Sequence, residues 1–346
     1  MPAPRWSALL LPFLALSVAL LLGALLIWAS GASVLAAYGG LFMGMAGSWQ
    51  ALSETGVAAT PYLFTGLAVA LGFRGGVFNI GVEGQLYMGA LSAVVVGYTL
   101  HGFPSWLHVS LALGAGGLGG ALWGGIPGVL KARLGAHEVI NTIMMNYMAM
   151  KLVDYLVKQC LRDPSASVDR TPVIVPSAVL PSLFGASTRL HAGLLVALAA
   201  VGLVAWLLGR TTIGFEIRTV GTNPRAAHYA GMPVARTVVL TMALSGLLAG
   251  LAGGSEVLGL YHTLPAAFST GYGFDAIAVA LVARSQPWAI LPAAFLWGGL
   301  RNGAGLMQMR TGVSIDVINI LQALVMVCLA AEPLWRLLLR RPQRLA

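Results

Sequence analysis

Residues 210–236 read Arg210-Thr-Thr-Ile-Gly-Phe-Glu-Ile-Arg-Thr-Val-Gly-Thr-Asn-Pro-Arg-Ala-Ala-His-Tyr-Ala-Gly-Met-Pro-Val-Ala-Arg236 and form a polar segment between two long apolar stretches. Asn223 suits a helix N-cap, and Pro224 suits the first helical position, where a missing N–H costs nothing. Gly231 suits the left-handed residue that follows a helix end. The sequence therefore predicts a capped helix of about two turns over 224–230. Its small-residue face would consist of Ala226, Ala227 and Ala230.

The composition places this helix in a membrane protein. Of the 346 residues, 58% are hydrophobic and 9% are charged, whereas a soluble domain has about 25% charged residues. So few polar side chains cannot cover a soluble globule, and membrane-spanning segments must be helical because lipid offers the backbone no hydrogen-bond partner. The net charge of +9 comes from basic residues scattered at the ends of apolar runs. This scatter does not indicate nucleic-acid binding.

The apolar pattern predicts an all-α integral membrane protein with ten spans in a single transmembrane domain, 1–346. The first span is long enough to be a retained helix rather than a signal peptide. Residues 159–190 are expected to form an external loop, and 259–272 either a surface loop or a partly re-entrant segment. The ten expected spans are 8–29, 56–73, 79–100, 107–130, 138–158, 191–209, 235–258, 273–284, 287–302 and 315–335.

Lysines and arginines predict the orientation, because cytoplasmic loops are enriched in them. With the N-terminus inside, thirteen basic residues fall on the inner side and five on the outer side, with Lys151 and Arg301 unassigned near helix ends. Both termini and residues 210–236 are therefore expected in the cytoplasm. The inner residues are Arg5, Arg74, Lys131, Arg133, Arg210, Arg218, Arg225, Arg236, Arg284, Arg336, Arg340, Arg341 and Arg344, and the outer residues are Lys158, Arg162, Arg170, Arg189 and Arg310.

Glycines at helical spacing predict close helix contacts, because small residues three or four apart let helix backbones approach in lipid. Two such series occur, Gly116, Gly120 and Gly124, and Gly246, Gly250 and Gly254.

Polar residues within apolar spans are candidates for function, because an ionisable group there costs about 2.5–3.5 kcal/mol and usually faces protein or water. The densest group is Arg74, Asn79, Glu83 and Gln85. Asn79 and Glu83 are expected to share a helix face, and Arg74 to reach Glu83 if the intervening glycines bend the chain. Two interpretations remain open, a conformational joint or transport path, and a structural polar cluster. Further candidates are Asn141, Asn146, Asp275 and Asn319.

The sequence contains no pattern that suggests catalysis. It has no histidine cluster with metal-ligand spacing, no nucleophile motif and no phosphate-binding glycine loop followed by Lys-Ser or Lys-Thr. We therefore expect neither an enzyme nor a bound metal.

Four segments resemble bacterial ABC-importer permeases of the nucleoside and simple-sugar branch, which is related to ribose and branched-chain amino-acid permeases. They occur in the family's order, and the resemblance covers about residues 50–332. The segments are Phe78-Asn-Ile-Gly-Val-Glu-Gly-Gln85, Glu138-Val-Ile-Asn-Thr-Ile-Met-Met-Asn-Tyr147, Val220-Gly-Thr-Asn-Pro-Arg-Ala-Ala-His-Tyr-Ala-Gly231 and Gly271-Tyr-Gly-Phe-Asp-Ala-Ile-Ala-Val-Ala-Leu281.

The resemblance implies a set of partners in the bacterial cytoplasmic (inner) membrane. A second permease subunit completes a transmembrane dimer, expected to be a heterodimer. An extracytoplasmic binding protein delivers the solute. Two cytoplasmic ATPase subunits hold ATP and Mg²⁺ and bind a coupling helix, which maps to 222–231, while the chain itself carries no cofactor. The coupling residues implied in this way are Arg218, Gly221, Asn223, Pro224, Arg225, His228, Tyr229 and Gly231.

Other functions remain open at this point. The solute is expected to be a nucleoside, with a ribose-like sugar as the alternative. An ion-coupled secondary transporter would need ionisable groups in the middle of spans, but most acidic residues lie near span ends. An intramembrane enzyme lacks any supporting motif.

Overall fold

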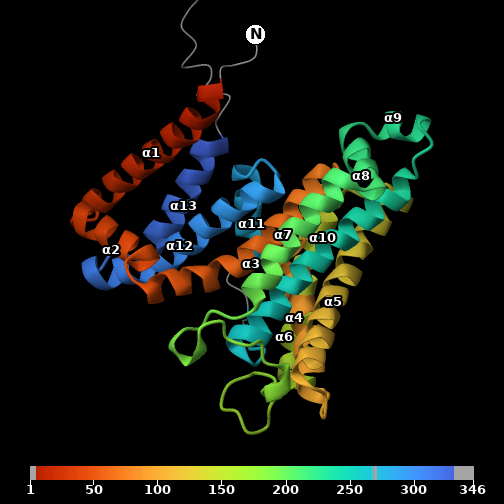
Figure 1. Cartoon of the computed structure of the whole chain (residues 1–346), viewed down its shortest axis with the longest axis horizontal. Coiled ribbons are helices and arrows are strands. Elements are labelled where there is room, and N and C mark those ends of the chain that lie inside the picture. Colours follow the sequence, from red (N-terminus) through yellow and green to blue (C-terminus); the bar gives the residue numbers. More distant parts are fainter. Residues whose placement is uncertain (1–4, 267, 269–270, 331–346) are drawn as a thin grey trace, which may run out of the picture. The chain divides into compact units, whose positions relative to one another are not determined.

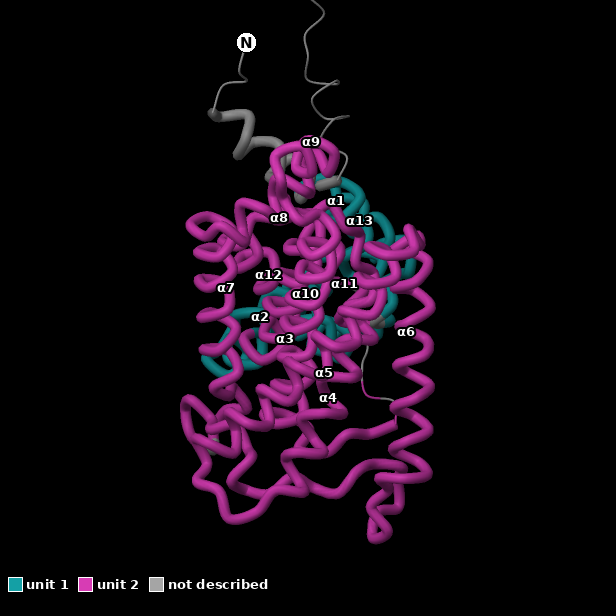
Figure 2. The backbone as a smooth tube through the Cα atoms, turned by 90° about the vertical axis from the view of Figure 1, so that its right-hand side faces the viewer, with its two compact units in different colours: residues 1–55, 299–346 teal, residues 56–298 magenta. Residues whose placement is uncertain are grey.

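The computed structural model describes residues 5–266, 268 and 271–330 (Figure 1), and it divides into two compact units (Figure 2). Unit 1 consists of residues 1–55 and 299–346, and unit 2 of residues 56–298. Helices α3 (Trp49–Arg74) and α12 (Pro287–Thr311) contribute to both units. Among the described residues the only β structure is two isolated bridges. The expected all-α architecture is therefore confirmed for the described part of the chain.

Unit 1 contains a helix that the sequence did not predict. Besides parts of α3 and α12, the unit comprises α1 (Arg5–Ala29), α2 (Val34–Ala46) and α13 (Ile315–Ala330). The unpredicted helix is α2, which begins after Ser33, whose Oγ accepts a hydrogen bond from the N–H of Ala36. The side-chain amide of Asn302 donates to the carbonyl oxygen of Gly44 over 2.8 Å and so ties α12 to α2.

Unit 2 is a helical bundle built around a buried central helix, α4, of whose eighteen residues twelve are buried. Two π-helical turns, η1 (Leu156–Cys160) and η4 (Val257–Tyr261), extend α6 and α10. Short 3-10 turns η2 (Pro176–Ala178) and η3 (Gly185–Ser187) lie in the long loop before α7. The helices of this unit are α4 (Val82–Thr99), α5 (Ser105–Leu134), α6 (Glu138–Tyr155), α7 (Gly193–Arg210), α8 (Thr212–Thr222), α9 (Pro224–Tyr229), α10 (Val234–Glu256) and α11 (Tyr272–Val282).

Helices α5 and α10 approach so closely that their contact surface is made of backbone. A Cβ atom added to Gly120 would lie 2.2 Å from the carbonyl oxygen of Gly246, and one added to Gly250 would lie 2.2 Å from that of Gly116. No side chain fits at these positions, and the glycine spacing of each helix places them in line. The predicted role of the two glycine series in helix packing is confirmed.

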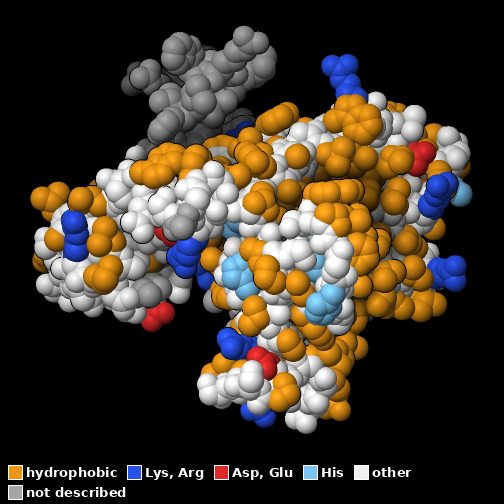
Figure 3. All heavy atoms as spheres, turned by 60° about the horizontal axis from the view of Figure 1, so that its bottom comes forward, with side chains coloured by type: hydrophobic (Ala, Val, Ile, Leu, Met, Phe, Trp, Pro, Cys, Tyr) orange, Lys and Arg blue, Asp and Glu red, His pale blue; other side chains and the backbone are white. Residues whose placement is uncertain are grey.

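Several helices are apolar enough to cross a membrane. Among the described residues, four helical segments are both long enough and apolar enough to span a bilayer: Trp49–Arg74, Ser105–Leu134, Gly193–Arg210 and Val234–Tyr261. Shorter apolar helices accompany them. Hydrophobic side chains cover broad areas of the surface, whereas charged side chains appear as scattered spots (Figure 3). The chain is therefore a multi-pass membrane protein, while ten spans and cytoplasmic termini stay predictions.

The two ends of unit 2 differ in character. Helix α9 lies at one end, and the long loop between α6 and α7 lies at the other (Figures 1 and 2). This loop pairs with the segment after η4, since the N–H of Thr171 donates to Leu264 over 3.1 Å and that of Ile174 to His262 over 3.0 Å. The predicted external loop and the described part of segment 259–272 therefore lie together, at the end of unit 2 opposite the segment predicted to be cytoplasmic.

Candidate functional site

Helix α9 has the caps that the sequence predicts. The Oδ1 atom of Asn223 accepts a hydrogen bond of 3.1 Å from the N–H of Ala226, and Pro224 occupies the first helical position. Gly231, with φ of +78°, adopts the left-handed conformation after the helix. The helix ends at Tyr229, one residue before the expected boundary. Because every cap lies within the segment, local sequence is sufficient to specify this helix.

A second short helix precedes α9 and was not predicted. Helix α8 begins after Thr211, whose Oγ1 accepts a hydrogen bond of 3.0 Å from the N–H of Gly214. Its buried side chains are Ile217 and Val220, three residues apart. Arg218 is exposed, and its Nε donates to the carbonyl oxygen of Gly214. The segment between α7 and α10 is therefore two helices that meet at Asn223.

Most of α9 is exposed, and one residue anchors it. Arg225, His228 and Tyr229 are exposed, with Tyr229 at 91% of its full exposure. Ala227 is fully buried and belongs to a cluster with Val77, Val220, Val238 and Met242. Ala226 and Ala230 are exposed, so the small-residue face is narrower than predicted. Helix α9 therefore presents polar and aromatic side chains outward and holds to unit 2 through Ala227.

The cluster around Ala227 connects α9 to the junction between α3 and α4, residues 75–81. Val77 lies in this junction, and Val220 lies on α8. At the same place the backbone of α8 touches the end of α3 and the start of the junction, since a Cβ atom on Gly221 would lie 2.1 Å from the carbonyl oxygen of Arg74 and 2.8 Å from the backbone nitrogen of Gly76. A cavity of about 810 Å³ opens beside this contact, with Lys131, His228 and Arg236 among its lining residues. Helix α9 and the junction therefore share one buried cluster, and α8, which precedes α9, touches the chain at the start of the junction.

The junction is a break between helices rather than part of one. Helix α3 ends at Arg74, α4 begins at Val82, and Gly76 adopts a φ of +69° between them. The prediction that Asn79 and Glu83 share a helix face is therefore wrong, because Asn79 precedes the helix. Two successive glycines favour this break, since glycine reaches positive φ at little cost.

Asn79 is instead the centre of a buried hydrogen-bond network. Its Nδ2 donates to Oγ of Ser245 over 2.8 Å and to Oε1 of Gln85 over 3.0 Å. Its Oδ1 accepts from the N–H of Gly81 over 2.9 Å and from Nε2 of Gln85 over 3.1 Å. Ser245 extends the network to α3, because its hydroxyl donates a hydrogen bond of 2.7 Å to the carbonyl oxygen of Ala68. The network joins the junction, α4, α10 and α3, and sequence reasoning missed Ser245, whose only signal was a hydroxyl in an apolar span.

Asn146 ties α6 to the same junction. Its Oδ1 accepts a hydrogen bond of 2.8 Å from the N–H of Gly84, and its Nδ2 donates to the carbonyl oxygen of Ile80 over 2.8 Å. Asn141, one and a half turns earlier, is half-buried, and its Nδ2 has no hydrogen-bond partner among the described residues. The two sequence candidates on α6 thus differ, since only Asn146 is hydrogen-bonded to the junction and to the start of α4.

The remaining candidates lie at three other places. Oε2 of Glu83 accepts a hydrogen bond of 2.6 Å from the N–H of Gly273, and Oδ2 of Asp275 accepts one of 2.8 Å from the hydroxyl of Tyr62. Nε of Arg74 donates to the carbonyl oxygen of Ser285 over 3.0 Å. Asn319 belongs to unit 1 and is exposed on α13.

These contacts hold helices together and form no reactive centre. The described residues contain no group of three or more His, Cys, Asp or Glu side chains placed to hold a metal ion. The arrangement instead links an exposed surface helix to a break in the buried helices of a membrane bundle.

Residues 51–330 match the family described as branched-chain amino acid transport system / permease component, and the chain belongs to this family of ABC transporter permeases. The guanosine ABC transporter permease protein NupP of Bacillus subtilis is 43% identical over 95% of this chain and 94% of its own length. The nucleoside ABC transporter permease protein NupB of Lactococcus lactis is 34% identical over 93% and 91%, respectively. The glucose ABC transporter permease protein TsgB13 of Haloferax volcanii is 32% identical over 96% and 90%.

Bacillus subtilis also has a more distant relative with the same transporter name, the guanosine ABC transporter permease protein NupQ, which is 29% identical over 70% of this chain and 77% of its own length. Permease subunits of ABC transporters are not enzymes themselves. The family resemblance and the transport function expected from the sequence are confirmed.

Proposed function

We propose that this chain is one transmembrane subunit of an ATP-driven importer that carries a nucleoside across the bacterial cytoplasmic membrane. The observation that carries the proposal is the buried cluster that Ala227 shares with Val77, which connects an exposed two-turn helix to the break between α3 and α4. An outward-facing helix with such an anchor is suited to be moved by a partner protein.

The mechanism follows from these contacts. Cytoplasmic ATPase subunits bind the exposed side of α9 and displace it when they close on ATP. Ala227 and the backbone of Gly221 then push on the junction, and the network around Asn79 and Asn146 transmits the shift to α4, α10 and α6. ATP thereby shifts the equilibrium between the outward-open and inward-open states of the bundle. The size of this shift is set by the difference in ATP affinity between the two states.

The charge of α9 suits an acidic partner groove. Arg225 is exposed and makes no ion pair with another described residue. Together with Arg218 it presents two guanidinium groups, which favour carboxylate partners because they donate paired hydrogen bonds in a fixed geometry. His228 and Tyr229 add polar and apolar contacts beside them.

The complete transporter contains further subunits under this proposal. A second permease completes the membrane dimer, two ATPases supply ATP and Mg²⁺, and an extracytoplasmic binding protein delivers the solute. The two guanosine permease proteins of Bacillus subtilis, at 43% and 29% identity to this chain, support a heterodimer of a similar and a more distant permease.

A nucleoside is the favoured solute, because the guanosine permease shares 43% of aligned residues over nearly the whole of both chains. A simple sugar is the second candidate, which the glucose permease at 32% identity supports.

The test is uptake by the complete complex in proteoliposomes. We expect guanosine uptake that requires ATP inside the vesicles and the loaded binding protein. Arg225→Glu and Gly231→Val should reduce uptake, whereas Arg133→Glu, which alters an exposed arginine outside α9, should leave it near the wild-type rate. Unchanged uptake in both α9 variants would remove the coupling role. Uptake that persists without ATP but stops when ion gradients collapse would instead establish a secondary transporter.

A further inference from the structure

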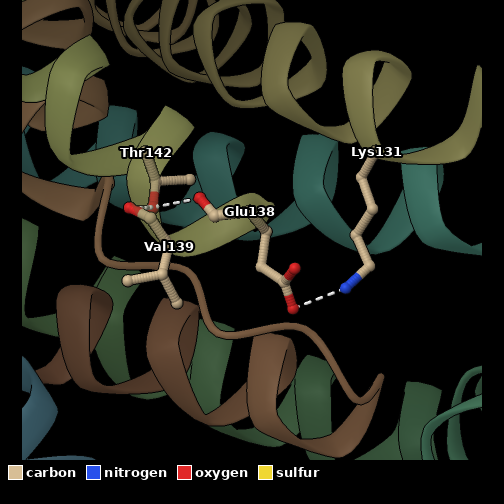
Figure 4. Close-up of polar contacts among 4 residues, drawn as sticks. All are labelled: Lys131, Glu138, Val139 and Thr142. Carbon is tan, nitrogen blue, oxygen red and sulfur yellow. Dashed lines mark hydrogen bonds and ion pairs between the residues drawn. The ribbon is translucent and has the colours of Figure 1, made fainter. Parts of the chain in front are cut away.

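Helices α5 and α6 form an antiparallel hairpin whose register is fixed at two points. Next to the turn, Nζ of Lys131 forms an ion pair with Oε1 of Glu138 over 2.5 Å (Figure 4). Further along, the indole Nε1 of Trp123 donates to the carbonyl oxygen of Met145 over 3.2 Å. The two contacts agree to within one residue on which position of α6 lies level with which position of α5.

This register places Lys151 level with the middle of α5. Thirteen residues along α6 from Glu138 is Lys151, and thirteen residues back along α5 from Lys131 is Leu118. Leu118 lies near the centre of Ser105–Leu134, a helix long and apolar enough to cross a membrane, and it is 62% exposed. Lys151 therefore lies at the depth of the hydrocarbon core.

Lys151 belongs to an exposed face of α6. Thr142, Met145, Asn146, Ala149 and Val153 are the buried residues of the helix, and α6 packs against α4 and α5. The exposed face contains Met144, Tyr147, Met148, Lys151 and Tyr155, at helical spacings of three and four.

The ammonium group of Lys151 has no counter-charge in the described part of the chain. No hydrogen bond or ion pair joins it to another described residue, and the nearest carboxylate along the helix, that of Asp154, is paired with Lys158 over 2.8 Å. An unpaired ammonium group is costly in lipid, so such residues usually face a protein interior or a water-filled cavity.

The Lys151 side chain cannot avoid the cost of an unpaired charge in lipid by extending its ammonium group to the membrane surface. Side chains on a helix tilt toward its N-terminal end, which for α6 is the end at Glu138, about 20 Å away at 1.5 Å per residue. The side chain of Lys151 is too short to cover that distance. An unpaired ammonium group at this depth is therefore unfavourable against lipid.

We propose that the face of α6 with Tyr147, Lys151 and Tyr155 lines the water-filled path of the solute. This inference rests on the proposed transport function and assigns the path to particular side chains. Neither tyrosine ring contacts another aromatic ring in the described residues, and the two residues are 57% and 59% exposed, so part of each ring is open to stacking. The solute class that fits is neutral or anionic, with a flat ring for the tyrosines and oxygen acceptors for the ammonium group, as in a nucleoside.

Thiol labelling of the complete complex tests whether the Lys151 face of α6 is accessible to water. With Cys160 and Cys328 replaced by serine, Lys151→Cys is compared with Leu118→Cys, which lies at the same depth on α5. We expect a charged, membrane-impermeant methanethiosulfonate to modify Lys151→Cys at least about tenfold faster, since a thiol reacts as its hydrated thiolate. Equally slow labelling of both positions, with and without trapped ATP, would overturn the proposal. Tyr147→Cys gives the same comparison if Lys151→Cys does not assemble.

Uptake measurements test the role of the charge. Lys151→Met should lower kcat/KM for guanosine about tenfold, the loss expected for one charge-assisted hydrogen bond, and Lys151→Arg should retain most of it. Lys158→Met, which removes a lysine of the same helix beyond this depth, is the matched control. Wild-type kinetics in Lys151→Met would remove the charge from the path. Labelling needs no transport, so failure of guanosine uptake by the wild-type complex would refute the proposed function alone.

Discussion

Asn146 holds Gly84 by a hydrogen bond of 2.8 Å from the glycine N–H to its side-chain oxygen, across 62 residues of sequence. The same side chain donates to the carbonyl oxygen of Ile80. One amide on α6 therefore bridges the last part of the helix break and the first turn of α4.

Replacing Asn146 by alanine should destabilise the complex. The change leaves the buried N–H of Gly84 and the partly buried carbonyl of Ile80 without these hydrogen-bond partners. Each unsatisfied group lowers the free energy of unfolding by about 1–3 kcal/mol. We expect the thermal midpoint of the detergent-solubilised complex to fall by several degrees. Met148→Ala, at an exposed position of the same helix, should change it little. Equal midpoints for Asn146→Ala and wild type would contradict the bridge.

A single methyl group on Gly120 should prevent close packing of α5 and α10. Its Cβ would lie 2.2 Å from the carbonyl oxygen of Gly246, which belongs to a helix backbone and cannot turn aside. Gly125→Ala is the matched control on α5, because nothing lies within 4 Å of its added Cβ. There the higher helix propensity of alanine should be neutral or stabilise by up to about 1 kcal/mol. Fluorescence-detected size exclusion and thermal unfolding measure the two opposite effects, and equal behaviour would exclude the backbone contact.

Gly221→Ala should uncouple ATP hydrolysis from transport. Its Cβ would lie 2.1 Å from the carbonyl oxygen of Arg74 and force α8 away from the junction. We expect fewer guanosine molecules transported per ATP hydrolysed, with basal hydrolysis by the ATPases retained. Gly209→Ala, which meets nothing within 4 Å near the end of α7, controls for helix propensity. A transport-to-hydrolysis ratio equal to wild type in Gly221→Ala would show that this contact does not transmit the movement.

The features that the sequence predicts well are those whose causes lie close together in the chain. Asn223, Pro224 and Gly231 cap α9 from within nine residues, and the glycines of α5 and α10 repeat at the helical period, so both were predictable. Helix α8 was missed because its two buried side chains are surrounded by polar residues. Without tertiary packing, so short an apolar pattern does not distinguish a helix from a loop.

The candidate site was predicted in its composition but not in its connections. Asn79, Gln85 and Asn146 were recognised as polar residues in an apolar setting, which is costly and therefore informative. Their actual partners are Ser245, the backbone of Gly84 and the backbone of Ile80. Such partners are set by how helices pack across 60 to 170 residues, which no local pattern encodes. The break at Gly75 and Gly76, which displaces Asn79 from α4, was underestimated for the same reason.

The turn between α11 and α12 contains two successive non-glycine residues in the left-handed region, Arg284 with φ of 49° and Ser285 with φ of 52°. Each costs about 1–2 kcal/mol relative to a right-handed conformation. Nε of Arg74 is bound to the carbonyl oxygen of this same Ser285. The hydrogen bond from Arg74 therefore fastens the end of α3 to a turn whose backbone is already strained, so the tertiary contacts around this turn must offset a cost of about 2–4 kcal/mol.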